Sequence, residues 1–160
     1  MRESLYISEL ETQQGYVQIF AHNTAVVEIA FADESITIER IQQKRKENEI
    51  SSCAKQQLQE YFAGKRQHFD FPLDASGTAF QKQVWAALMD VPFGHTASYL
   101  DIATAIGKPK ACRAVGAANG KNPIAIVVPC HRIIGTNGKL TGYAGGMSRK
   151  AFLLDLESRA

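Results

Sequence analysis

Apolar and polar residues alternate along the first part of the chain, a pattern typical of strands that bury one face. Residues 15–20 and 25–31 are predicted to form a hairpin, because they flank the turn-forming pair His22-Asn23. The same period of two continues over residues 36–40, which could add a third strand ahead of the basic run at 44–46. We expect this region to form a small sheet.

A helical period follows between Asn48 and Phe62, where apolar residues recur on one stripe until Gly64 ends the pattern. The stripe comprises Ile50, Ala54, Leu58, Tyr61 and Phe62. Residues 69–73 contain Pro72 and are predicted to be an extended connection into the second half. The first 74 residues are therefore predicted to be a small α/β domain.

Helical periods separated by glycine and proline dominate the second half. One helix is predicted to start at a Ser76 or Thr78 cap, to keep Trp85 in the core and to end at the breaker over residues 91–94. A final helix is predicted over residues 148–157, with its first residue, a serine, as the cap. We expect this half to be mainly helical.

Two shorter helices are predicted between them, at 98–106 and at about 110–119, joined by the tight Lys108-Pro109 turn. Ser98 is expected to cap the first of the two. Helices joined by so short a turn are a helix-turn-helix candidate, although many helix pairs in soluble proteins look alike.

The run from Ile124 to Val128 is short and rich in β-branched residues, which predicts a buried extended segment. Pro129 ends any strand pairing, and Cys130 and His131 follow. An imidazole beside a thiol can favour the thiolate, which is the nucleophilic form of cysteine. The pair alone is weak evidence, because a cysteine on an apolar strand is more often an inert core residue.

The charge of the chain is divided unevenly. Residues 1–74 carry 8 Lys+Arg and 12 Asp+Glu, a net charge of −4, whereas residues 75–160 carry 10 and 4, a net charge of +6. A basic second half suits the neutralisation of DNA phosphates, although solvated surface lysines would give the same balance.

The cysteines and the start of the chain bear on the compartment. The 3 cysteines have no short paired spacing, which argues against a disulfide framework or a Cys-rich zinc site. The first ten residues lack a secretion signal, and no apolar run approaches the ~20 residues that span a bilayer. We expect a cytoplasmic protein that does not enter a membrane.

One longer pattern includes the cysteine. The chain reads Pro-Cys-His-Arg-Ile at 129–133, with Asn-Pro at 122–123 before it and Gly-Tyr-Ala-Gly-Gly at 142–146 after it. This pattern closely resembles the signature of the O6-alkylguanine-DNA alkyltransferases, the suicide DNA-repair proteins also called methylated-DNA-protein-cysteine methyltransferases. The resemblance runs without gaps from about Phe80 to Glu157.

The resemblance implies a ribonuclease H-like α/β domain over residues 1–74. It also implies a mainly helical DNA-binding domain over residues 75–160, containing the helix-turn-helix and the active-site cysteine. The expected activity moves an alkyl group from O6 of guanine, and less well from O4 of thymine, to Cys130. Because a thioether has no easy hydrolytic exit, each molecule would react once. The expected partner is double-stranded DNA containing O6-alkylguanine, and a monomer would act without a metal, a nucleotide or an external methyl donor.

The resemblance assigns five catalytic roles. Cys130 would be the nucleophile, His131 the base that deprotonates it through a water molecule, and Glu157 the carboxylate that orients the imidazole. Tyr99 would help to turn the nucleotide out of the helix and donate its hydroxyl to guanine. Asn122 would tie the end of the second helix to the cysteine segment.

Contacts to DNA and to the lesion are expected from a second group. The resemblance places the second helix in the minor groove, which is about 6 Å wide, with Arg113 in the space of the flipped-out nucleotide. Tyr143 would stack on the base, and Ala144 stands where some members have serine, so only a backbone N–H could reach the lesion oxygen there. Arg132 is expected to form a structural ion pair. The expected DNA- and substrate-binding residues are Arg113, Ala114, Gly116, Ala117, Val128, Tyr143, Ala144 and Lys150.

Three other functions fit part of the pattern. A cysteine hydrolase would use the same Cys-His pair but would turn over, and the chain shows no acyl-binding signature. An alkyltransferase-like lesion sensor would share the DNA-binding scaffold but lack the acceptor, which is present here as Cys130. A simple helix-turn-helix regulator would need Arg113 but would not need Cys130, His131 and Glu157 together.

Overall fold

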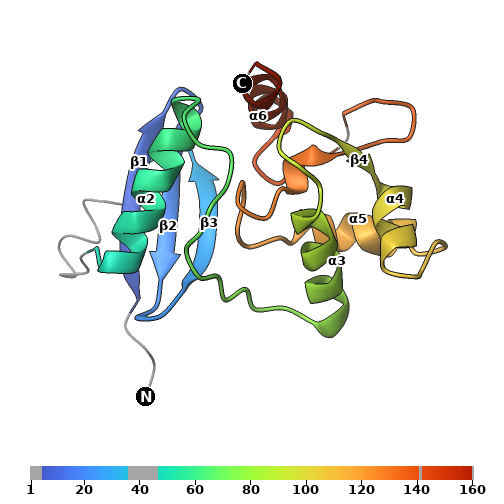
Figure 1. Ribbon diagram of the computed structural model, residues 1–160, viewed down its shortest axis with the longest axis horizontal. Helices are drawn as coiled ribbons and strands as arrows, with labels where there is room; N and C mark the ends of the chain where they lie inside the picture. The colour runs from blue at the N-terminus through green and yellow to red at the C-terminus, as the bar shows by residue number, and fades with distance from the viewer. Residues whose placement is uncertain (1–4, 36–46, 141, 160) are drawn as a thin grey trace. The chain divides into compact units, whose positions relative to one another are not determined.

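The computed structural model describes residues 5–35, 47–140 and 142–159, and the chain forms two compact units, Met1–Ser76 and Gly77–Ala160 (Figure 1). Among the described residues, no helix is both long enough and apolar enough to cross a membrane. Each unit has its own hydrophobic core.

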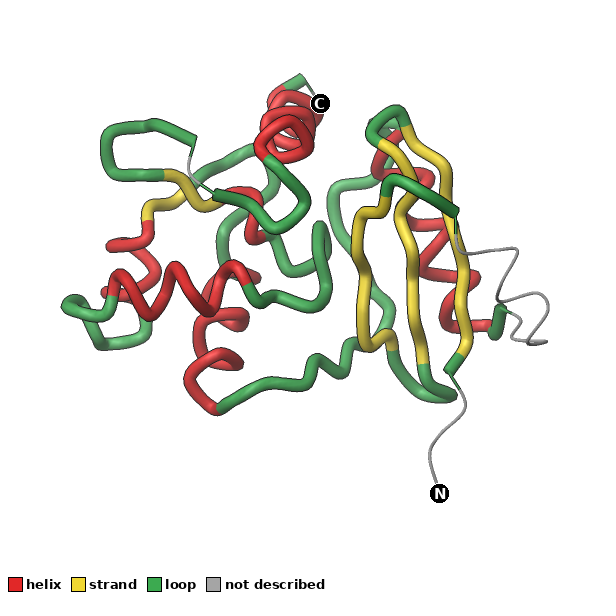
Figure 2. Tube along the Cα trace, turned by 180° about the vertical axis from the view of Figure 1, so that it is seen from behind, coloured by secondary structure: helices red, strands yellow, loops and turns green. Residues whose placement is uncertain are grey.

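The first unit is an antiparallel sheet of strands β1 (Tyr6–Thr12), β2 (Gly15–Ala21) and β3 (Val26–Ala32), in that order, with helix α2 packed on one face (Figures 1 and 2). The predicted hairpin is confirmed as β2 and β3, and His22 N donates to Ala25 O at 2.9 Å in its turn. The third strand expected over residues 36–40 lies outside the described residues.

Strand β1 is a correction to the sequence analysis, which assigned no strand to it. Ser8 is buried within β1, because its hydroxyl donates to the Ser51 hydroxyl of α2 at 2.9 Å. A polar residue on the buried face breaks the apolar-polar alternation by which strands are recognised. The strand could not be recognised from the sequence, because the hydrogen bond that allows Ser8 to be buried is made with a residue far away in the chain.

Helix α2 (Glu49–Phe62) begins where the sequence predicted. Asn48 caps it: its side-chain oxygen accepts from Ser51 N at 2.8 Å, while Ser51 Oγ accepts from Asn48 N at 3.0 Å. After the helix the chain runs back beside β3, where Leu73 pairs in parallel with Val26. The connection predicted to be extended thus borders the sheet.

The second unit contains helices α3 (Ala79–Met89), α4 (Tyr99–Ala105), α5 (Cys112–Gly120) and α6 (Met147–Ser158). A 3-10 turn, η1 (Cys130–Arg132), leads into the short strand β5 (Ile133–Ile134), which pairs in parallel with β4 (Ala97–Ser98). Thr78, one of the two expected candidates, caps α3, and Ser98 caps α4 as predicted. The indole of Trp85 is buried and donates to Ala118 O at 2.9 Å, which joins α3 to α5.

Two local predictions were wrong. The segment Ile124–Val128 is buried as expected but is folded into tight turns, in which Val127 N donates to Ala125 O at 2.8 Å. An apolar run predicts burial well, but it does not show whether the backbone pairs with a strand or with itself. Helix α6 starts at Met147, so Ser148 is inside it; Gly146, at φ +98°, makes the turn into the helix without a side-chain cap.

Gly77 lies directly against Trp85, and this contact can be tested. A Cβ at Gly77 would lie 2.5 Å from the indole ring, so Gly77→Ala should destabilise the second unit by about 1–3 kcal/mol through overpacking. Trp85 is the only tryptophan, so the urea midpoint of its fluorescence reports on this unit. Gly120→Ala is the matched control, because its added Cβ would meet no atom of the described residues within 4 Å beyond its chain neighbours and its own helix backbone. Equal midpoints for both variants would contradict the close packing of Gly77 against Trp85.

Candidate active site

The thiol of Cys130 lies at the start of η1 and is almost fully buried, with the residue 4% exposed. The turn that carries it is tight, since Cys130 N donates to Val128 O at 2.8 Å. Four residues earlier, Ile126 has φ +73°, a conformation that β-branched residues rarely adopt. Such strain persists only where the surroundings hold it, and it is common at functional sites.

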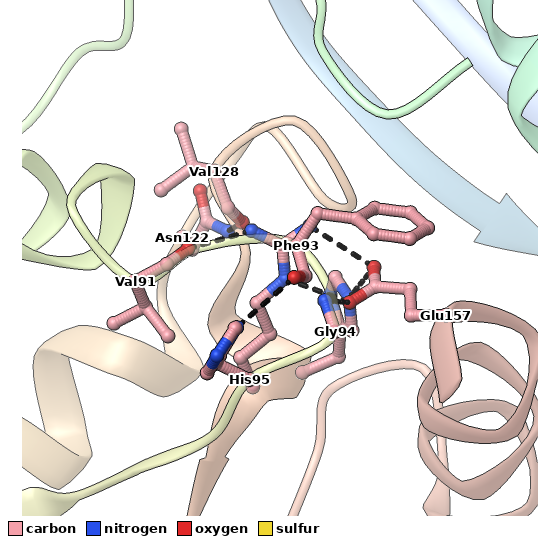
Figure 3. A network of polar contacts seen from close by, with 9 residues as sticks. Val91, Phe93, Gly94, His95, Asn122, Val128 and Glu157 are labelled. Atoms are coloured by element: carbon pink, nitrogen blue, oxygen red, sulfur yellow. Dashed lines mark hydrogen bonds and ion pairs between the residues drawn. The ribbon is translucent and has the colours of Figure 1, made fainter. Parts of the chain in front are cut away.

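Asn122 ties the end of α5 to the cysteine turn. Its side-chain amide donates to Val128 O at 2.8 Å and to Cys130 Sγ at 3.1 Å, while its oxygen accepts from Ile124 N at 3.0 Å. Figure 3 shows Asn122 held against Val128 in this way. The amide therefore fixes the position of the sulfur and supplies it with a hydrogen-bond donor. The tie expected between α5 and this segment is present.

His131, Arg132 and Glu157 form a buried network behind the cysteine. The Nε2 atom of His131 lies 2.6 Å from Glu157 Oε2. Because a carboxylate accepts, Nε2 carries the proton, and Nδ1 is left as an acceptor. Among the described residues, His131 Nδ1 has no hydrogen-bond partner. The arrangement provides a buried imidazole that is held in one tautomer and can receive a proton at Nδ1.

The expected ion pair of Arg132 is also present. Its Nε and Nη2 atoms donate to the two oxygens of Glu157 at 2.8 and 3.1 Å. Its Nη1 donates to Val91 O at 2.7 Å, and Gly94 N adds a longer bond to Glu157 Oε1 at 3.4 Å. Figure 3 shows Glu157 beside the turn that carries Phe93 and Gly94.

Burial determines the resting protonation of the site. It raises the pKa of the Cys130 thiol above its usual value, although the Asn122 amide and the Lys150 charge act in the opposite direction. Burial likewise lowers the pKa of His131, against the opposing effect of Glu157. At neutral pH the free protein therefore holds a protonated thiol and a neutral imidazole. From the sequence, the neighbouring histidine was expected to favour the thiolate of Cys130. The buried environment instead favours the protonated thiol in the free protein.

Lys150 lies close enough to Cys130 to lower the pKa of its thiol, and Cys130 lies close enough to Tyr143 to raise the pKa of the phenol. Lys150 is completely buried, and its ammonium donates to Ile133 O. Burial lowers the pKa of Lys150, and the neighbouring Cys130 opposes this shift. The Tyr143 hydroxyl is buried without a hydrogen-bond partner among the described residues, and burial raises its pKa. Lys150, expected to bind DNA or substrate, thus has no exposed surface in this structure.

Helix α5 presents the expected DNA-binding residues on its outer face. Arg113, Ala114 and Ala117 are exposed, whereas Val115 and Ala118 pack inward. A Cβ added at Gly116 would lie 3.7 Å from the Tyr99 ring, so these two predicted residues are neighbours. The helix begins at Cys112, two residues later than predicted. Ala144 is also exposed.

Three contributors to the site were missed by sequence reasoning. Val91 O and Gly94 N bind the Arg132–Glu157 pair, and Asn119 Nδ2 donates to Cys130 O at 3.4 Å. Two of these contacts use backbone atoms. Because every residue type carries a backbone carbonyl, and all but proline an N–H, such contacts cannot be recognised from the amino-acid sequence. The breaker over residues 91–94 was recognised as a helix end, but nothing in its composition signals contact with a carboxylate 63 residues later.

The fold and the site together define a class of two-domain proteins with a buried cysteine beside a histidine-carboxylate pair. Sequence models of two domains match the chain: the 6-O-methylguanine DNA methyltransferase ribonuclease-like domain over residues 1–75, and the DNA binding domain of the same family over residues 79–159. The chain therefore belongs to the 6-O-methylguanine DNA methyltransferase family, as the signature around Cys130 suggested.

Individual relatives agree with this. The chain is 61% identical over 110 residues to the methylated-DNA-protein-cysteine methyltransferase of Mycobacterium tuberculosis H37Rv, covering 68% of this chain and 67% of the relative. It is 56% identical over 115 residues to the constitutive enzyme of Bacillus subtilis, covering 71% and 70%. The crystal structure of the M. tuberculosis O6-methylguanine methyltransferase superposes with a TM-score of 0.85 at 43% identity, covering 98% of this chain and 94% of that one. A complex of the M. tuberculosis protein with DNA gives the same TM-score at 42% identity, covering 96% and 93%. The predicted family and fold class are confirmed.

The raised pKa of Cys130 predicts a distinctive pH dependence. Iodoacetamide reacts with thiolate, so Cys130 in the free protein should label at least about tenfold more slowly at pH 8 than the exposed Cys53. Its rate should increase as the pH rises past 9, because the folded pKa lies above the usual value. Peptide mass spectrometry separates the two sites. Equal labelling of both at pH 8 would contradict the assignment.

The bond from Asn122 to sulfur can be removed by Asn122→Ala. A hydrogen bond to a charged group contributes about 1.5–3 kcal/mol, so its loss should raise the pKa of the Cys130 thiol further. The pH profile of Cys130 labelling measures this shift. Asn137→Ala is the control, because Asn137 is exposed and, among the described residues, its side chain accepts locally from Lys139 N. An unchanged profile in Asn122→Ala would show that the amide does not stabilise the thiolate.

Proposed function

We propose that this chain repairs alkylated DNA directly, by transferring an alkyl group from O6 of guanine to Sγ of Cys130. Relatives with the same architecture are named methylated-DNA-protein-cysteine methyltransferases, and one related structure holds DNA. The observation that carries the proposal for this chain is the buried thiol held by Asn122, with the His131–Glu157 pair beside it. Double-stranded DNA containing O6-alkylguanine is the proposed partner, bound by a monomer.

The geometry supports a defined order of proton movements. A water molecule passes the Cys130 proton to Nδ1 of His131, and Glu157 stabilises the resulting imidazolium. The thiolate then attacks the alkyl carbon, a carbon-sulfur bond forms and the bond from that carbon to O6 breaks. The electron pair of the broken bond stays with guanine, which receives a hydrogen bond or a proton from the Tyr99 hydroxyl. The products are S-alkylcysteine and normal guanine, so each molecule acts once.

Access to the lesion requires the nucleotide to leave the duplex, because the thiol is buried and the alkyl group is enclosed by the base stack. The exposed face of α5 supports entry into the minor groove, with Arg113 at its N-terminal end and small residues along it. Tyr99 packs beside Gly116 on this side of the unit and is the proposed residue for turning the nucleotide out. Tyr143, half-buried near Cys130, would then stack on the base.

The lesion pocket has further proposed members. Val128 is buried and its carbonyl already binds Asn122, which places it next to the cysteine turn. Ala144 is exposed on the loop before α6 and could offer only its backbone N–H to the lesion oxygen. Lys150 is proposed to act on charge near the sulfur, because its buried ammonium lowers the thiol pKa. A cysteine hydrolase and a simple regulator gain no comparable support.

A single-turnover reaction tests the proposal. Limiting protein is incubated with a duplex containing O6-methylguanine, and repaired DNA and peptide masses are followed with time. We expect one methyl group on the Cys130 peptide and repair that stops at one lesion per protein molecule. Cys130→Ser should bind the lesion duplex without repairing it.

Two outcomes would overturn the proposal. Lesion binding without methyl transfer by the unmodified protein would favour a sensor, and repair beyond one lesion per molecule would favour a turnover enzyme. A parallel duplex containing O4-methylthymine tests substrate preference, and a slower reaction is expected there. The peptide analysis must separate Cys130 from Cys112, which lies in α5.

A further inference from the structure

Arg132 touches more of the site than an ordinary structural ion pair requires. Its guanidinium binds both oxygens of Glu157, donates to the Val91 carbonyl at 2.7 Å and lies over the Phe93 ring, 5.7 Å from the centroid. The residue is buried, so these charged contacts are poorly screened by water. One side chain thereby joins η1, α6 and the turn that follows α3.

The fork on Glu157 has a direct effect on the base. Two parallel bonds from a planar guanidinium fix the plane of a carboxylate, which a single ammonium cannot do. Oxygen Oε2 is the atom that meets His131 Nε2 at 2.6 Å, so the orientation of the carboxylate fixes the imidazole and its tautomer. Arg132 therefore acts on Nδ1 of His131 without touching it.

Through its contacts to Val91 and Phe93, Arg132 also positions the segment that leads to α4. The turn over residues 91–94 leads into β4, and β4 pairs with β5, the strand that directly follows Arg132. Ser98, the last residue of β4, caps α4, whose first residue is Tyr99. A shift of the arginine would thus disturb both the base and the start of the helix that bears Tyr99.

We propose that Arg132 is a positioning residue for alkyl transfer, which sets the orientation and basicity of His131 through Glu157 and holds the turn leading to Tyr99. This inference rests on the proposed function. It goes beyond a stabilising ion pair, because it assigns the arginine an effect on the rate constant and on its pH dependence.

The sign of the pH effect follows from the charges around His131. Burial and the cations Arg132 and Lys150 lower the pKa of His131, while Glu157 raises it. The thiol of Cys130 is the remaining ionisable neighbour on η1. The buried Tyr143 hydroxyl lies near that thiol. A base must be neutral before it can accept a proton. Removing the Arg132 charge raises the pKa of His131, so the acid limb of the rate profile moves to higher pH.

The test compares single-turnover rate constants of methyl transfer from pH 5.5 to 9 for the unmodified protein, Arg132→Lys and Arg132→Met. We expect Arg132→Met to lose rate most at acid pH, by about tenfold for each unit of pKa rise. Arg132→Lys keeps the charge but loses the fork, so its rate should fall at every pH while the acid limb stays in place. Arg159→Met is the matched control, since Arg159 is exposed and pairs only with Asp155 among the described residues.

The amount of folded protein is measured separately from the rate. The total methyl group transferred counts competent molecules, and Trp85 fluorescence gives the unfolding midpoint. If Arg132→Met does not fold, Arg132→Lys still tests the proposal, because its rate constant at the pH-independent plateau should be lower than that of the unmodified protein. The inference is overturned if folded variants react with the rate and pH profile of the unmodified protein, or if only the total transferred falls. Failure of the unmodified protein to transfer methyl would instead overturn the proposed function.

Discussion

The second unit depends on how one buried carboxylate is satisfied. Glu157 lies in α6 and accepts hydrogen bonds from Arg132 and His131 on η1 and from Gly94 in the turn after α3. A buried charge is tolerated only when it is paired, and removing one partner from such a pair costs about 3–5 kcal/mol. Three segments distant in sequence must therefore meet at this carboxylate. The same contact that holds them together holds the imidazole in one tautomer, so packing and chemistry share one interaction.

The cysteine is held by a different device, a strained turn closed by an amide. A left-handed conformation at a β-branched residue costs on the order of 1–3 kcal/mol, and the turn at Ile126 contains one. Burial of its apolar neighbours and the three bonds of Asn122 offset that cost. The result is a thiol whose position is set by the end of α5, the helix proposed to meet DNA. The proposed DNA contact and the nucleophile would thus be connected through the side chain of Asn122.

The sequence predicted much of what depends on near neighbours, although it misplaced the cap of α6. Caps at Thr78 and Ser98 were found because a capping side chain binds a backbone group only three residues away. Strand β1 was missed because Ser8 is satisfied by Ser51, 43 residues later. The turns before Cys130 were mistaken for an extended segment, because burial alone does not determine backbone pairing.

The candidate site, too, could be predicted from the sequence only in part. The signature around Cys130 identified the family and the chemical groups. It also assigned a role in the site to Glu157, a residue type that usually lies at the solvent-exposed surface. The resting ionisation of the thiol could not be foreseen, since it follows from burial by the whole unit. The contacts from Val91 and Gly94 use backbone atoms and are equally invisible in residue types.

The outer face of α5 has one more consequence. Ala114, Gly116 and Ala117 carry no side-chain donors or acceptors, so in a minor groove they could not tell a G·C pair, with its amino group, from an A·T pair. Apart from Arg113, which is proposed to enter the base stack, a helix of this composition would fit the shape of the groove without reading the bases that line it. For the proposed repair protein, base sequence would then place no restriction on where in a genome it can work, and damage alone would mark its sites.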